Sequence, residues 1–355
     1  MTILALESSC DDTCAAVIDA DGLMRSNVIS SQHVHERFGG VVPEIASRHH
    51  LEIVGAVVAQ ALSDADATLD DVELVAATQG PGLVGALLVG FSTAKALAAA
   101  RELPFAAVDH LQGHVAANFL RGVHGPQNGA GAEDGPFEPP FLCLIASGGH
   151  TLLAHVTAHD GFEVLGRTLD DAAGEAFDKG ARMLGLGFPG GALLEKLAAD
   201  GDPQAFHFPG ARGERSQGAR GAGRKAFSQG LDFSFAGVKT ALLYALRELS
   251  ETEVKARAAD LAASYQEAIV DSLIARTERA LERTGIDRLA VGGGVAANGE
   301  LRRRLRELGV TLHVPPRALC TDNAAMIASA ARYSEQLPYP RYLALDAYAT
   351  GERPR

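Results

Sequence analysis

Residues 141–156 read FLCLIASGGHTLLAHV. An apolar run is followed by a loop of small residues, SGGHT, and then by a second apolar run. A strand, a short loop and a returning strand are typical of a β-hairpin. The same arrangement occurs near the N-terminus, where ILAL (3–6) and TCAAVID (13–19) flank the loop ESSCDD. The repeated pattern predicts two related halves, each opened by a hairpin.

The segments that follow each hairpin also correspond. LVAAT (74–78) reads as a buried strand, and QGPGLVGALLVGFSTAKALAAA (79–100) turns into a long apolar helix. In the second half, RLAVGGGVAANGELRRRL (288–305) repeats the pattern, with Asn298 close to the start of the helix. Buried strands followed by helices indicate layered α/β architecture.

Length and composition bound the possible functions. The 355 residues suffice for about two domains, and we expect one half at 1–139 and another at 140–355, whose last segment returns to the first. The net charge of −12 argues against a broadly basic surface for nucleic acid. No apolar run reaches the ~18 residues of a membrane span, and no secretory signal precedes ESSCDD. Four cysteines without a CxxC pair favour thiols in a reducing cytoplasm.

Three glycine-rich loops suit an anionic ligand. SGGHT (147–151), the PGG of GFPGGALLEK (187–196) and GGGVAAN (292–298) each offer backbone N–H groups that a phosphate can approach. Each loop by itself fits a tight turn equally well. Asp178 leads towards the PGG turn, so we place it nearest the ligand. The chain has no GxxxxGK[ST] motif, which excludes a P-loop.

Two histidines, His110 and His114, lie four residues apart in HLQGHVAANFL. On a helix they share one face, where two imidazoles can hold a metal or can simply be half-buried side chains. A HExxH metalloprotease needs glutamate after the first histidine, and here that residue is Leu111. A rival cluster is expected at the surface or facing RNA: His33, His35, His49 and His50.

Together these motifs resemble one family. ESSCDDT, GGVVPEIASRHH, GPGLVGALLVG, HLQGH, SGGHT, DDAAGEAFDKGARMLGL, PGG, DFSFAGVKT, GGGVAAN and CTDNAAMIA occur in the order of the TsaD/Kae/OSGEP family, formerly described as O-sialoglycoprotein endopeptidases. The resemblance implies the actin-like, Hsp70-like, sugar-kinase-like (ASKHA) fold, with nucleotide and metal in the cleft between its halves. It also implies transfer of threonylcarbamoyl from threonylcarbamoyl-adenylate to N6 of adenosine at tRNA position 37, in tRNAs reading codons that begin with adenine. AMP is released.

The resemblance also implies a set of site residues. One metal, Fe²⁺ or alternatively Zn²⁺, is assigned to His110, His114 and Asp322, although Asp322 also fits a helix N-cap. The nucleotide part of the donor is assigned to a second group: Ile145, Ala146, Ser147, Gly148, Gly149, Asp178, Gly191, Glu195 and Asn298. The chemistry further suggests the paired acids Asp11 and Asp12 as candidate bases for N6, of which we choose Asp11, although it also fits a structural aspartate of the turn. Ser8, Ser9 and Thr13 are candidate phosphate contacts.

The family works with a TsaB-like paralogous partner and a TsaE-like P-loop ATPase, and we expect both here. For tRNA contact the candidates are the basic segment 211–225 and the helix LRRRLRE (301–307), each of which also fits a solvated surface. Two alternatives remain from the sequence: a small-molecule kinase or ATPase of the same fold, and a non-enzymatic scaffold.

Overall fold

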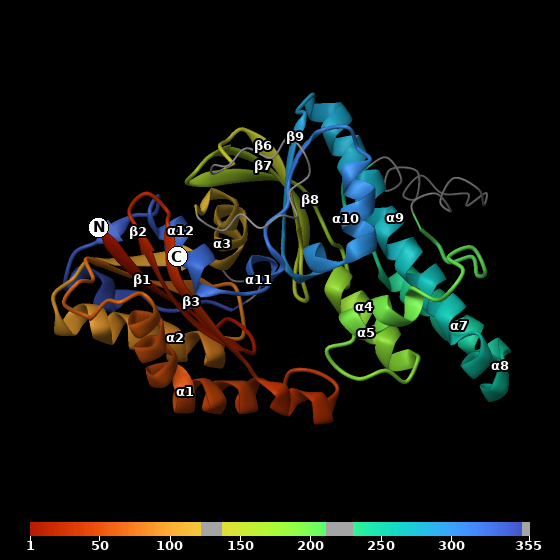
Figure 1. Cartoon of the computed structure of the whole chain (residues 1–355), viewed down its shortest axis with the longest axis horizontal. Helices are drawn as coiled ribbons and strands as arrows, with labels where there is room; N and C mark the ends of the chain where they lie inside the picture. The colour runs from red at the N-terminus through yellow and green to blue at the C-terminus, as the bar shows by residue number, and fades with distance from the viewer. Residues whose placement is uncertain (122–136, 211–229, 350–355) are drawn as a thin grey trace. The chain divides into compact units, whose positions relative to one another are not determined.

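The computed structural model describes residues 1–121, 137–210 and 230–349 (Figure 1). The chain divides into two compact units, which are described separately below. Unit 1 comprises Met1–Pro139, Thr157–Gly161 and Pro315–Arg355, and unit 2 comprises Pro140–Val156 and Phe162–Val314. The basic segment 211–225 proposed for tRNA contact lies outside the described residues.

Unit 1 is built on a mixed sheet with the strand order β11-β5-β4-β1-β2-β3 among the described residues. The strands are β1 (Thr2–Glu7), β2 (Asp12–Asp19), β3 (Met24–Ser31), β4 (Leu74–Gly80), β5 (Phe105–Asp109) and β11 (Gln336–Leu337). The predicted hairpin is confirmed, because β1 and β2 pair antiparallel with Leu6 opposite Ala15. The strands β1, β4 and β5 run parallel to one another.

Helices cover both faces of this sheet. They are η1 (His33–Phe38), α1 (Pro43–Asp64), α2 (Val84–Ala100), α3 (His110–Ala116), η2 (Ala117–Phe119), α11 (Arg317–Cys320), α12 (Ala324–Ala331) and η5 (Arg341–Ala344). Alternate side chains of the strands, such as Leu4 and Leu6, form a core with α1 and α2. The helices α12 and α3 pack together on the opposite face (Figure 1).

Unit 2 has a second mixed sheet, ordered β10-β9-β6-β7-β8 in the described part of the chain. The strands are β6 (Phe141–Ala146), β7 (Thr151–Ala158), β8 (Gly161–Arg167), β9 (Arg288–Gly292) and β10 (Thr311–His313). The hairpin predicted at residues 141–156 is confirmed as β6 and β7, with Ala146 opposite Thr151 across the SGGHT loop. The strand β6 also pairs parallel with β9.

The helices of unit 2 gather around one long central helix. They are α4 (Ala173–Met183), α5 (Gly191–Ala198), α7 (Ala236–Glu248), α8 (Glu251–Ala256), α9 (Ala258–Thr284), η4 (Gly294–Ala297) and α10 (Gly299–Arg306). The central helix α9 contacts α4, α5, α7, α8 and α10 (Figure 1). None of the helices in the described ranges combines the length and apolar character that crossing a bilayer requires.

Candidate functional site

The first part of the site lies at one edge of the unit 1 sheet. Glu7 is the last residue of β1, Thr78 lies near the end of β4, and His110 directly follows β5. These strands are neighbours and parallel, so their carboxyl ends meet at the same edge. Residues far apart in the sequence are thereby brought into contact, and such edges are where open α/β sheets place ligands.

The helix α3 presents both histidines of HLQGH on one face. It begins at His110, after Asp109, whose carboxylate accepts hydrogen bonds from the backbone N–H groups of Leu111 and Gln112. The i and i+4 spacing places the imidazole rings of His110 and His114 with centroids 4.8 Å apart. Both side chains are almost completely buried.

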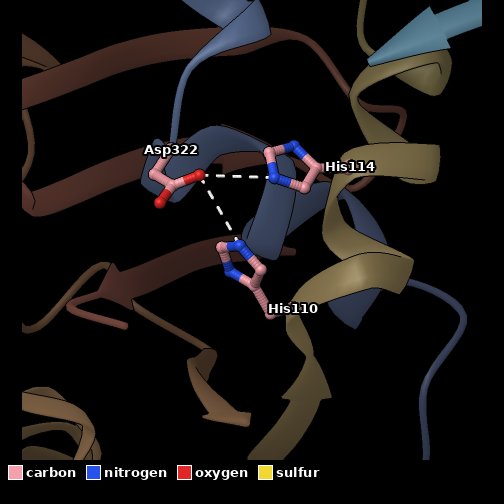
Figure 2. A group of neighbouring side chains, drawn as sticks. All are labelled: His110, His114 and Asp322. Carbon is pink, nitrogen blue, oxygen red and sulfur yellow. Dashed lines mark ion pairs between the residues drawn. The ribbon is translucent and has the colours of Figure 1, made fainter. Parts of the chain in front are cut away.

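Asp322 faces both histidines from the segment before α12 (Figure 2). Its Oδ1 lies 3.5 Å from His110 Nε2 and 3.3 Å from His114 Nε2. One potential ligand atom of each residue lies within 4.8 Å of the others. The expected alternative role of Asp322 as helix cap is wrong: the next residue, Asn323, caps α12 by accepting from Met326 N–H. The Asp322 carboxylate is therefore available to face the imidazoles.

The donor set fits a transition metal ion. His114 Nε2 is buried and, within the described residues, has no hydrogen-bond partner, as expected for an atom prepared for a ligand. Two imidazoles and one carboxylate are the ligands of the 2-His-1-carboxylate sites that hold non-haem Fe²⁺, and they also suit Zn²⁺.

Negative charge accumulates around this group. Burial lowers the pKa of His110, but the Asp322 and Glu7 carboxylates outweigh it and raise the pKa to about 9. Burial raises the pKa of Glu7, but His110 more than offsets this and the net pKa is lowered. Burial, together with the neighbouring carboxylates, raises the pKa of Asp12 to about 7. A hydrogen bond with Ser31 lowers this pKa but does not offset the rise. A cation bound here would relieve this repulsion between carboxylates.

The ESSCDD loop is held from several sides. The Ser8 hydroxyl donates to Ala86 O and accepts from Gly90 N–H, so it anchors the loop to α2. The Ser9 hydroxyl lies 3.3 Å from His110 Nδ1. The Thr13 hydroxyl lies 2.7 Å from His50 Nδ1 and is buried. Asp11 and Asp12 are half-buried, whereas Ser8, Ser9 and Thr13 are buried, so the two acids are more accessible to a substrate than the hydroxyl groups are.

The four histidines of the rival cluster differ in burial. The expectation of surface or RNA-facing side chains is wrong for His35 and His50, which are both fully buried. His50 Nε2 lies 3.0 Å from the backbone oxygen of Cys10, so His50 supports the ESSCDD loop from behind. His33 is exposed and pairs with Glu36.

The cysteines are free thiols in the described ranges, as the sequence predicts. Cys10 is half-buried, and Cys14, Cys143 and Cys320 are buried.

In unit 2, the SGGHT loop packs closely on two glycine positions. Gly174 N–H, in the first turn of α4, donates to Ser147 O, and a β-carbon at Gly174 would lie 2.8 Å from Gly148 N. Gly293 has φ +84°, and a β-carbon there would lie 2.4 Å from Ala146 O. By contrast, nothing lies within 4 Å of a β-carbon built on Gly148 or Gly149. The loop is therefore fixed at its base and open at its tip.

The PGG turn differs from expectation. We expected its N–H groups to be open to phosphate, but Gly190 and Gly191 both donate to the Asp178 carboxylate, at 2.7 and 3.1 Å. Asp178 therefore shapes the turn before α5. Farther along α5, Glu195 Oε1 accepts from Gly299 N–H at 2.8 Å. The predicted nucleotide residues of α4, α5 and α10 are thus joined within unit 2.

Asn298 and the arginine helix have structural partners. Asn298 caps α10 by accepting from Leu301 N–H, and its amide donates to Gln266. The expected RNA surface at LRRRLRE is not supported, because Arg304 is buried and paired with Glu267 and Asp271. Its neighbour Arg302 is also buried, and Arg303 pairs with Glu300 and Glu307.

Sequence reasoning did not single out Glu7, Thr78 or His50 as supports of the site. The signal that could have found Glu7 is a carboxylate that ends the buried run ILAL. A charged residue at the end of a buried strand is rarely unpaired.

The structure resembles solved proteins of the actin-like ASKHA class, which confirms the predicted fold. Component A of the (R)-2-hydroxyglutaryl-CoA dehydratase of Acidaminococcus fermentans matches with a TM-score of 0.53 at 14% identity, over 94% of this chain and 97% of that one. Full-length HypF, in a phosphate- and nucleotide-bound form, matches with a TM-score of 0.56 at 14% identity, over 94% of this chain and 55% of that one. At this identity the likeness concerns the fold alone.

Sequence comparison is more specific. The TsaD family model, described as tRNA N6-adenosine threonylcarbamoyltransferase, matches residues 23–329. A protein of that name from Pelobacter propionicus is 46% identical over 360 residues, covering 100% of this chain and 98% of that protein. Another from Symbiobacterium thermophilum is 48% identical over 337 residues, covering 93% and 91%. The chain therefore belongs to the TsaD family of tRNA N6-adenosine threonylcarbamoyltransferases.

Proposed function

We propose that this chain transfers the threonylcarbamoyl group of threonylcarbamoyl-adenylate to N6 of adenosine 37 in tRNAs that read codons beginning with adenine. Membership of the TsaD family carries the proposal, and tRNA is accordingly the substrate. The chemistry of unit 1 supports it, because an ATPase or small-molecule kinase of this fold has no need of the His/His/Asp donor set found there.

In this reaction the acyl donor is already activated, whereas the acceptor nitrogen is a poor nucleophile. The adenine N6 lone pair is delocalised into the ring, while the carbamoyl carbon is already activated by AMP as leaving group. N6 attacks that carbon, the bond to the phosphate oxygen breaks, and AMP leaves. The protein therefore has to orient the two reactants, accept the N6 proton and stabilise the departing phosphate. We assign Asp11 as the base that accepts the N6 proton. Its half-buried carboxylate lies in the ESSCDD loop.

His110, His114 and Asp322 would hold the metal ion. When bound, it supplies Lewis-acid polarisation and a template for the substrate. Fe²⁺ is the metal we favour, since two histidines and one carboxylate are typical of non-haem iron sites, with Zn²⁺ as the alternative.

We place the nucleotide part of the donor on unit 2. The loop tip at Gly148 and Gly149 suits the phosphate, because space remains around both α-carbons and a concave run of backbone N–H groups binds anions. Ile145, Ala146 and Ser147 lead into this loop. Because Asp178 already occupies the Gly190 and Gly191 amides, we assign Asp178, Gly191, Glu195 and Asn298 to the nucleoside rather than to the phosphate.

Contact with tRNA is proposed for the basic segment 211–225 rather than for α10, because Arg303 and Arg304 of α10 are paired with carboxylates of unit 2. We place the protein in the cytoplasm with its tRNA. Each phosphate that the segment neutralises releases counterions, so its contribution should decline as salt rises. Replacing its five basic residues with serine should weaken tRNA binding and flatten its salt dependence. Unaltered tRNA affinity and salt slope would locate the RNA surface elsewhere.

A TsaB-like paralogous partner and a TsaE-like P-loop ATPase complete the proposal. The adjacent helices α1 and α2 support a protein partner, because they expose large apolar side chains: Leu51 is 70% exposed, Val84 49% and Leu88 41%. Exposed apolar patches of this kind mark interaction surfaces. We assign this α1/α2 face to the TsaB-like partner. Leu88→Glu should abolish co-purification with it, whereas Leu169→Glu, at a 62% exposed leucine of unit 2, should not.

The function is tested by reconstitution. The chain and its two partners are supplied with tRNA, labelled threonine, bicarbonate, ATP and the enzyme that makes the adenylate. We expect label to enter tRNA only when this chain is present. Phosphorylation of a sugar or of acetate by the purified chain, without any label in tRNA, would instead establish the kinase of the same fold.

A further inference from the structure

Glu7 is a buried carboxylate at the centre of the unit 1 site. Its side chain is fully buried. One oxygen, Oε2, lies 3.0 Å from His110 Nδ1 and accepts from the Thr78 hydroxyl at 2.5 Å. The other oxygen accepts from the backbone N–H of Ser9. Glu7 therefore joins β4, the ESSCDD loop and the first residue of α3.

The two nitrogens of His110 face different carboxylates. Nδ1 faces Glu7, and Nε2 faces Asp322 at 3.5 Å. An imidazole that donates its Nδ1 proton to a carboxylate has its tautomer and ring orientation fixed, and Nε2 carries the lone pair. Nε2 of His110 points towards Asp322, on the same side as His114 Nε2 (Figure 2), so in the neutral ring that a metal requires the lone pair would point there too.

We infer that Glu7 is a positioning residue for the metal centre: it fixes His110 as the Nδ1–H tautomer and so presents Nε2 as a ligand. The inference rests on the proposed metal assignment. Carboxylates that accept from ligating histidines also raise the basicity of the ring, and their loss typically costs about 10–100-fold in metal affinity.

The alternative, that Glu7 only stabilises the fold, explains these contacts less well. Removing a carboxylate from water costs several kcal/mol, so an apolar side chain would stabilise this strand end at least as well. Glu7 also holds Ser9, within two residues of the candidate base Asp11. The same carboxylate thus ties the orientation of His110 to the path of the loop that carries Asp11.

Zinc binding and histidine tautomers test the inference. In protein labelled with ¹⁵N-histidine, the zinc-loaded parent should show His110 with a proton on Nδ1 and none on Nε2. Glu7→Gln should bind Zn²⁺ about 10–100-fold more weakly in a chelator competition, and His110 should lose its single tautomer. The matched control is Asp271→Asn, which removes a buried carboxylate from the Arg304 pair in unit 2 and should leave zinc affinity within threefold.

The outcomes separate this inference from the metal assignment. If the parent binds no zinc, the metal assignment and the inference both fail. If the parent binds zinc but carries the His110 proton on Nε2, or if a folded Glu7→Gln variant keeps parental affinity, the inference alone fails. The tautomer in the parent decides the matter even if Glu7→Gln does not fold.

Discussion

Replacing Gly148 with valine should abolish nucleotide binding while leaving the fold intact. A β-carbon at Gly148 meets no atom within 4 Å, and φ lies outside the left-handed region. The protein therefore has room for the side chain. We propose that the valine side chain would occupy the space at the loop tip where we place the phosphate of the donor.

The expected loss follows from the hydrogen bonds removed. Each bond from a backbone N–H to a charged phosphate contributes about 1.5–3 kcal/mol. Losing two of them costs about 3–6 kcal/mol, which corresponds to roughly a 100-fold to 10,000-fold rise in Kd for AMP.

Isothermal titration calorimetry with AMP measures this loss, and thermal unfolding checks the fold. Gly161→Val is the matched control, because a β-carbon at Gly161 also meets no atom within 4 Å and the residue lies at the start of β8, away from the SGGHT loop. Gly161→Val should bind AMP as the parent does. An AMP Kd within threefold of the parent in folded Gly148→Val would show that the loop is only a turn.

Three further variants probe the rest of the account. His114→Ala should lower bound metal severalfold in mass spectrometry of the folded protein, because a buried ligand atom is lost; parental metal content would refute its role. Arg304→Met should destabilise unit 2 by about 2 kcal/mol in urea unfolding, because it removes a charged hydrogen-bond partner from the buried Asp271 carboxylate. Burial raises the pKa of Asp171, but Lys179 and Lys239 lower it overall, so its contribution to stability is present above pH ~4 and is lost as pH falls. Asp171→Asn should therefore be less stable at neutral pH and lose less stability between pH 5 and 3; parallel pH profiles would contradict this.

The sequence predicted local features better than long-range pairing. Both hairpins follow from short apolar runs around small-residue loops, and the i, i+4 spacing of His110 and His114 is a property of the helix itself. The contact between Glu7 and His110 spans 103 positions and depends on which strands become neighbours. No local pattern contains that information.

The incorrect expectations have the same origin. LRRRLRE looks like a basic surface until α9 supplies Glu267 and Asp271 from a distant segment. The PGG amides look open until Asp178, on a different helix, accepts from them. Asp322 looks like a cap, and only the backbone at α12 shows that Asn323 has that role. In the first two cases a partner from another segment decides what the group does, whereas at α12 the choice between two neighbouring candidate caps depends on the backbone conformation.

The most direct test of the central claim is the identity and position of the product. The reconstituted chain is supplied with two tRNAs that differ at one base, adenosine or guanosine at position 37, and the digested nucleosides and released nucleotide are analysed by mass spectrometry. We predict threonylcarbamoyladenosine from the adenosine tRNA alone, AMP released in equal amount, and neither in a folded variant that lacks both His110 and His114. Modification that persists without adenosine 37, or in that double variant, would contradict the account.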